Sequence, residues 1–240
     1  TQDAPGGGVR TGRPARSGAG RVGVAGVLAG LAFGLGLSLA LGFLRTGAPR
    51  GSEGWTALDT TLREPLPGWD PAFPLTVMTF NIRHARGLDG RVDLERVAAV
   101  IDRWQPHLVA LQEVDVRWSW RSRFTDQLGS LARRTGMAAV PGPALRRPGG
   151  GWYGNAILSR LPVIQAERLL LPRYGTVEDR SLLHARVQAG DGILHFVTLH
   201  LGLRAAERVL HAGRTVDYLA TLRGPLVVAG DWNDRPGGPA

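Results

Sequence analysis

The chain has 240 residues, a net charge of +9 and no cysteine. This length accommodates one domain of ordinary size with further segments, and the lack of cysteine excludes a disulfide scaffold and a thiolate metal site. All 29 basic residues are arginine and they are scattered along the chain, which indicates a solvated arginine surface more than a dedicated polyanion-binding patch.

The N-terminal segments predict attachment to a membrane. Residues 1–21 are rich in Gly, Ala and Arg, so we expect a disordered basic N-terminus. Residues 22–44 carry no charge, and about 20 apolar residues in a helix are enough to cross a bilayer. A single transmembrane helix is therefore expected. A cleaved signal peptide is the alternative, although its apolar region usually has only about 7–15 residues.

Either alternative exports the rest of the chain. Four arginines precede the apolar segment and two follow it, which favours a cytoplasmic N-terminus and an extracytoplasmic C-terminal domain. Residues 45–74 are rich in Pro, Gly and Ser and predict a linker between the membrane and this domain.

Residues 75–240 alternate between apolar strands and helical patterns, which predicts an α/β layered domain. Asp93 is the expected N-cap of the first helix, and Pro106 ends that helix. The Pro- and Gly-rich segment 140–151 predicts a loop. Strands are expected at 75–81, 108–111, 155–159, 182–187, 193–199 and 226–229, and helices at 94–104, 125–134 and 204–222.

Four of the expected strands are followed by polar side chains. Asn81, Glu113 and His200 stand at or just beyond three strand ends, and Asp231 and Asn233 follow the fourth. Such residues often form a site at the edge of a sheet. His195 lies five positions before His200, an odd offset in a strand, so it faces the other way and is expected to be structural.

These residues lie in five short motifs. The motifs are Thr79-Phe-Asn-Ile82, Leu111-Gln-Glu-Val114, Gly154-Asn-Ala-Ile-Leu-Ser159, Thr198-Leu-His-Leu201 and Gly230-Asp-Trp-Asn233. They occur in the order seen in the endonuclease/exonuclease/phosphatase superfamily, and the chain resembles that superfamily over residues 75–234. The resemblance implies a four-layer α/β sandwich, in which helices flank two packed mixed sheets, and divalent-metal-dependent phosphoester hydrolysis by an activated water.

The resemblance also implies roles for single residues. Glu113 and Asn81 would bind the metal, and a carboxylate suits Mg²⁺, with Mn²⁺ as a substitute. Asp231 would orient and deprotonate the attacking water, and Asn233 would steady the nucleophile or the phosphorus centre. His200 would donate a hydrogen bond to the phosphate as negative charge develops.

Two further residues have open roles. Asn155 is expected either to contact the substrate or only to brace the site. Arg180 is expected either to clamp a substrate phosphate or to form a structural ion pair.

The chain departs from the superfamily pattern after Asn233. The superfamily has one more strand that ends in Asp-His, and no such pair occurs between Asn233 and Ala240. We therefore expect a C-terminally truncated piece of a longer protein with impaired catalysis. A catalytically defective binding module of the same fold is the alternative.

The expected substrate is a phosphoester. A lipid headgroup suits a domain tethered to a bilayer, and nucleic acid suits the positive charge. Trp118, Trp120, Arg121 and Arg123 follow Glu113 closely and either contact such a partner or pack over the sheet edge. No feature of the sequence indicates an obligate protein partner.

Overall fold

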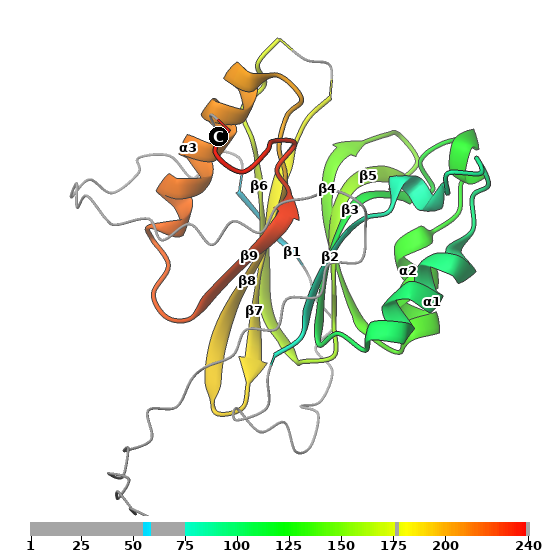
Figure 1. Ribbon diagram of the computed structural model, residues 1–240, viewed down its shortest axis with the longest axis horizontal. Helices are drawn as coiled ribbons and strands as arrows, with labels where there is room; N and C mark the ends of the chain where they lie inside the picture. Colours follow the sequence, from blue (N-terminus) through cyan, green and yellow to red (C-terminus); the bar gives the residue numbers. More distant parts are fainter. Residues whose placement is uncertain (1–54, 59–74, 176–177, 239–240) are drawn as a thin grey trace, which may run out of the picture.

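The computed structural model describes residues 55–58, 75–175 and 178–238 (Figure 1). The expected disordered N-terminus at 1–21 and transmembrane helix at 22–44 lie outside these residues. Within the described ranges, no helix combines the length and the apolar character that crossing a bilayer requires.

Two mixed sheets pack against each other (Figure 1). The first has the strand order β2-β3-β5-β4, formed by β2 (Val77–Asn81), β3 (Leu108–Val116), β5 (Trp152–Ser159) and β4 (Ala138–Arg146). The second has the order β1-β6-β7-β8-β9, formed by β1 (Trp55–Leu58), β6 (Val163–Leu170), β7 (Ser181–Ala189), β8 (Gly192–His200) and β9 (Leu226–Asp231).

Helices cover the outer faces of both sheets. Helices α1 (Leu94–Trp104) and α2 (Gln127–Thr135) pack on the first sheet, and α3 (Ala205–Leu219) packs on the second (Figure 1). The result is the expected sandwich of two mixed sheets between helices. Two short 3₁₀ helices, η1 (Arg83–Ala85) and η2 (Trp120–Ser122), follow β2 and β3.

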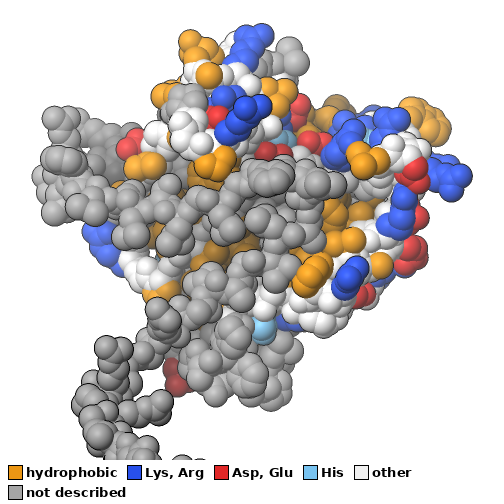
Figure 2. All heavy atoms as spheres, viewed as in Figure 1, with side chains coloured by type: hydrophobic (Ala, Val, Ile, Leu, Met, Phe, Trp, Pro, Cys, Tyr) orange, Lys and Arg blue, Asp and Glu red, His pale blue; other side chains and the backbone are white. Residues whose placement is uncertain are grey.

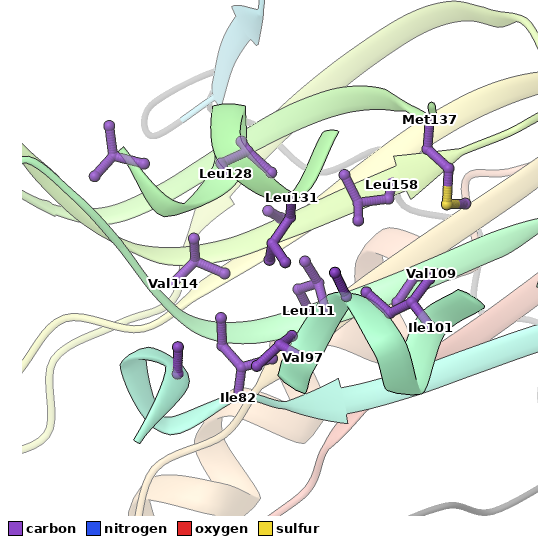
Figure 3. Close-up of a cluster of buried hydrophobic side chains, with 14 of the residues drawn as sticks. Ile82, Val97, Ile101, Val109, Leu111, Val114, Leu128, Leu131, Met137 and Leu158 are labelled. Atoms are coloured by element: carbon purple, nitrogen blue, oxygen red, sulfur yellow. The ribbon is translucent and has the colours of Figure 1, made fainter. Parts of the chain in front are cut away.

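Helix α1 begins and ends where the sequence predicts. The carboxylate of Asp93 accepts hydrogen bonds from the backbone N–H groups of Glu95 and Arg96, which the first turn of a helix leaves without partners. Gln105 adopts a left-handed conformation at the other end. Val97 and Ile101 face the sheet and join the outer core with side chains of α2 (Figure 3).

Alternation along β3 divides the core into two parts. Leu108 and Ala110 point between the sheets, where Phe196 of the second sheet is fully buried. Val109 and Leu111 point to the other face and pack under α1 and α2 (Figure 3). Both faces are covered there, so the first four residues of the strand, 108–111, are all apolar rather than alternating with polar residues.

The expected loop at 140–151 is wrong for its first half, because β4 spans Ala138–Arg146. Pro141 and Pro143 lie in this strand although proline has no N–H to donate to a sheet. The strand order places β4 at an edge, where one side of the strand needs no partner and proline is tolerated.

Besides β4, two strands have no counterpart among the expected elements. β6 carries Gln165, Glu167 and Arg168 among its apolar residues, which interrupts the alternation typical of a strand. β1 lies within the range 45–74 that the sequence assigns to a linker, and it pairs antiparallel with β6. Four residues of that range thus belong to the second sheet.

Candidate active site

β2, β8 and β9 end at one edge of the sandwich, where Gln112 and Glu113 within β3 lie beside the end of β2. β2 runs parallel to β3 in the first sheet, and β8 runs parallel to β9 in the second. β2 and β9 are in contact across the two sheets. The topology therefore brings Asn81, Glu113, His200 and Asp231 together although they are far apart in the sequence.

Two carboxylates converge on the amide of Asn81. Its Nδ2 donates to Glu113 Oε1 at 2.8 Å and to Asp231 Oδ2 at 2.9 Å. Its Oδ1 accepts from the backbone N–H of Arg83 at 3.0 Å, which determines the orientation of the amide. One neutral donor thus holds together two acids, one contributed by each sheet.

A β-bulge presents Glu113 to the site. The register of β3 against β5 shifts between Leu111 and Val114, and Glu113 has a φ of 58°. A bulge re-aims a side chain out of the strand alternation, and a left-handed non-glycine residue is strained unless its surroundings hold it. The neighbouring Gln112 is buried and donates to Thr198 Oγ1 in the other sheet at 3.0 Å, which anchors the bulge.

His200 is buried between Arg180 and Asp231. Arg180 Nη1 lies 3.0 Å from His200 Nδ1, and a guanidinium can only donate, so Nδ1 is the acceptor. The neutral ring therefore carries its proton on Nε2, which lies 3.6 Å from Asp231 Oδ2. Burial, and then the charge of Arg180, lower the pKa of His200 to about 4 against the opposing effect of Asp231.

Asn233 lies in a turn directly after β9. The strand ends at Asp231, and Asn233 has a φ of 51°. Its backbone N–H donates to Asp231 Oδ1 at 3.0 Å, and its Nδ2 donates to the carbonyl of Leu201 at 2.8 Å. This turn holds the second oxygen of Asp231, because Asn side chains tolerate left-handed backbone in turns.

Asn155 and Arg180, whose roles the sequence leaves open, are both buried and both make polar contacts next to His200. Asn155 is buried and donates to the carbonyl of Ser181 at 2.6 Å, so it braces the start of β7 next to Arg180. Arg180 is also buried and forms an ion pair with Glu178 at 2.9 Å. The guanidinium therefore has both an ion pair and the contact with His200.

Tyr153 belongs to the same region and was not among the expected residues. Burial raises the pKa of its hydroxyl, and so do the nearby carboxylates of Glu113 and Glu178. The signal in the sequence was its position two residues before Asn155, on the same face of one strand.

The donor set suits a divalent cation with few protein ligands. Among the described residues, no three His, Asp or Glu side chains lie close enough to form a complete metal cage. Glu113 and Asp231 nevertheless place two carboxylate oxygens around one small neutral group, an arrangement in which a cation relieves the repulsion between like charges. Mg²⁺ commonly takes one or two carboxylates and keeps water and substrate oxygens as its other ligands.

Comparisons with known proteins agree with this arrangement. Residues 78–240 match the model of the endonuclease/exonuclease/phosphatase family. An endonuclease/exonuclease/phosphatase from Beutenbergia cavernae DSM 12333 has a similar structure, with 30% identity and a TM-score of 0.54. The alignment covers 68% of this chain and 49% of that one. No curated protein shows a significant match.

Two structures of the protein TDP2 share the fold at lower identity. TDP2 from Caenorhabditis elegans has 22% identity and a TM-score of 0.53, and the alignment covers 68% of this chain and 48% of that one. D. rerio TDP2 in complex with a single-strand DNA product has 19% identity and a TM-score of 0.53, and the alignment covers 68% of this chain and 62% of that one. The chain thus spans about half the length of the first two relatives. Because the family model covers more than half of the sequence, the chain belongs to the endonuclease/exonuclease/phosphatase family.

Proposed function

We propose that this protein is a divalent-metal-dependent phosphoester hydrolase that uses an activated water. The observation that carries the proposal is the convergence of Glu113 and Asp231 on the amide of Asn81. The neutral His200 lies next to them, and its Nε2–H can donate a hydrogen bond to a substrate. This set contains a hard oxygen ligand, a base and a hydrogen-bond donor, which are the groups that phosphoester hydrolysis needs.

Asp231 is the base in this proposal. Asn81 and the backbone N–H of Asn233 each hold one of its carboxylate oxygens, which orients the group toward the site edge. An oriented carboxylate positions a water and accepts its proton as the water attacks phosphorus. Asn233 acts through Asp231 here, because its own side-chain amide is bound to Leu201.

His200 and Arg180 stabilise the negative charge that develops on the phosphoryl oxygens. The Nε2–H of His200 is the available donor, because its Nδ1 accepts from Arg180. A buried donor fixed before the reaction is worth more than one in water, because it need not reorient. Asn155 braces this pair through the backbone of Ser181.

Glu113 is the proposed metal ligand, with Mg²⁺ as the expected ion and Mn²⁺ as its substitute. The bound ion would act as a Lewis acid toward the phosphoryl oxygens. Asn81 presents its amide nitrogen to the carboxylates, so it would have to turn its Oδ1 inward to become a ligand. In the orientation seen here, Asn81 positions Glu113.

We also propose that residues 22–44 anchor the protein in a membrane, with the domain outside the cytoplasm. The support is the uncharged apolar segment and the excess of arginine before it. Alkaline carbonate should leave the protein in the membrane fraction, and protease that cannot cross the membrane should digest the domain when it is added from the extracytoplasmic side. Extraction by carbonate would contradict the anchor, and protection from protease would contradict the orientation.

The enzymatic proposal is tested on the complete product of the gene. We expect hydrolysis of bis-p-nitrophenyl phosphate or p-nitrophenyl phosphate with Mg²⁺ or Mn²⁺ and none with EDTA. Asp231→Asn should lower kcat by about 10²–10⁴-fold, the usual contribution of a general base. Asp191→Asn, in the exposed turn between β7 and β8, is the matched control and should leave kcat unchanged. Absence of hydrolysis with both metals, or full activity of Asp231→Asn, would refute the proposal.

A further inference from the structure

The loops that follow β2 and β3 expose large hydrophobic side chains next to the candidate active site. Leu88 is 95% exposed and Trp120 is 82% exposed, more than any other large hydrophobic side chain among the described residues. Leu88 lies at the tip of a tight turn, in which Gly90 N–H donates to the carbonyl of Gly87. The two loops are neighbours, because η1 contacts η2 and Gln127 Nε2 donates to the carbonyl of His84 at 2.7 Å.

The structure holds Trp120 in this exposed position. The next residue, Arg121, forms a bidentate ion pair with the fully buried Asp115, at 2.7 and 3.0 Å. The ring of Trp120 packs by its edge on Phe124, with centroids 5.1 Å apart, and Arg147 lies over Phe124 at 5.2 Å. A bidentate, half-buried ion pair orders a loop, so the exposure of Trp120 is built into the fold.

Exposed arginines surround these two side chains. The three segments 83–91, 117–126 and 146–151 contain eight arginines and only two aspartates, and all eight arginines are exposed. Figure 2 shows the same mixture at the upper right, where blue arginine and orange hydrophobic side chains alternate over the region of η1 and η2. The eight arginines are Arg83, Arg86, Arg91, Arg117, Arg121, Arg123, Arg146 and Arg147.

We propose that this surface docks onto an anionic lipid bilayer, with Trp120 and Leu88 entering the headgroup region. Tryptophan is favoured at membrane interfaces, and exposed basic residues are attracted to an anionic surface. The charge complementarity and the uncharged apolar segment at 22–44 both favour a membrane as the partner.

A single-stranded nucleic acid is the competing partner, and the observations favour it less. Bases stack on planar side chains, and Leu88, the more exposed of the two residues, offers no planar surface. Aliphatic and aromatic side chains at loop tips both gain from entering the acyl boundary. Docking at this edge would present the candidate active site to phosphoesters at the membrane surface, and it does not require that the site be catalytic.

The absence of cysteine allows a single reporter to be placed in the full chain. A polarity-sensitive fluorophore on Leu88→Cys is observed in the chain reconstituted into phosphatidylcholine vesicles, with and without about one third phosphatidylglycerol. We expect a blue shift only in the anionic vesicles, quenched by lipids that carry a quencher near the headgroup. The same fluorophore on Asp191→Cys, in the exposed turn between β7 and β8, should not respond.

Substitutions in the labelled chain separate the contribution of the inserted tryptophan from that of the arginine charges. Trp120→Ser should lower the ratio of docked to undocked domain about tenfold, which corresponds to 1.4 kcal/mol. Trp104→Ser, at the C-terminal end of α1, removes another partly exposed tryptophan and should have no effect. The pair Arg117→Gln and Arg123→Gln should lower the ratio by about tenfold or more, because two charges leave the interface.

Three results would overturn the proposal. They are an equal response in neutral vesicles, an equal response at Asp191→Cys, and a response to a single-stranded oligonucleotide that exceeds the response to anionic vesicles. The fluorescence does not depend on turnover, so an inactive protein that docks and an active protein that does not dock are distinguishable.

Discussion

Asn81→Ala is the perturbation that tests the centre of the site most directly. The amide donates to Glu113 at 2.8 Å and to Asp231 at 2.9 Å, and the variant loses both bonds. Hydrogen bonds to charged groups contribute about 1.5–3 kcal/mol each, and these carboxylates are only partly buried, so the lower end of that range applies. The free energy of unfolding without metal should fall by about 3 kcal/mol.

The assay is thermal unfolding in detergent with EDTA, followed by tryptophan fluorescence. For a domain of this size about 1 kcal/mol shifts Tm by 2–4 °C, so Tm should fall by about 10 °C. Gln127→Ala is the matched control, because its buried side chain also makes two hydrogen bonds, to Asp115 N–H and to the carbonyl of His84. An unchanged Tm for Asn81→Ala would refute the conclusion that this amide holds the two carboxylates together.

A magnesium titration of the same variant tests the role of Asn81. Binding at 100 times the Kd stabilises a folded protein by about 2.7 kcal/mol. A smaller Mg²⁺-dependent rise in Tm than in the wild type is expected, because Asn81 holds the proposed ligand Glu113 in place, and an equal or larger rise would exclude Asn81 both as a ligand and as a residue that positions Glu113.

Three further predictions concern the metal, the buried histidine and the aromatic loop. Glu113→Gln should raise the Mg²⁺ concentration for half-maximal activity by at least about tenfold, because a neutral amide is a weaker ligand, and an identical titration would exclude Glu113 as the ligand. His200 has a folded pKa of about 4 and an unfolded pKa near 6.5, so the unfolded state alone binds its proton between these values. The contribution of this residue to the free energy of unfolding is therefore complete above pH 6.5 and falls by at most about 3 kcal/mol as the pH drops to 4. In urea unfolding, the free energy of unfolding of His200→Asn should fall less steeply over this pH range than that of the wild type. Parallel pH curves for the two proteins would contradict this prediction. Asp115→Asn breaks the bidentate ion pair between the buried Asp115 and the half-exposed Arg121, so the free energy of unfolding should fall by about 2–3 kcal/mol. Trypsin should then cleave faster between Arg117 and Arg123. Unchanged proteolysis would show that the pair does not order the loop.

Local patterns in the sequence were enough to predict most of the elements. The stripe from Leu94 to Trp104 with Asp93 before it describes α1 to the residue, because a cap and a 3.6-residue period are local properties. β4 was predicted as a loop because its prolines are compatible with a strand only at a sheet edge. Edge position is a property of the assembled sheet, so no local pattern in residues 138–146 indicates it.

The candidate site also has features that the sequence predicts and features that only the assembled sheets determine. The sequence by itself determined that Asn81, His200 and Asp231 stand at strand ends, because the apolar runs that precede them form buried strands. The expectation that Glu113 follows a strand end is wrong, because β3 continues past it to Val116. Only the tertiary structure decided that two sheets bring these residues to one edge, that a bulge turns Glu113 inward, and that the side chain of Asn233 binds the backbone. The physical reason is that strand ends are encoded by neighbouring residues, whereas strand order, register shifts and the packing of two sheets depend on contacts between residues up to 150 positions apart.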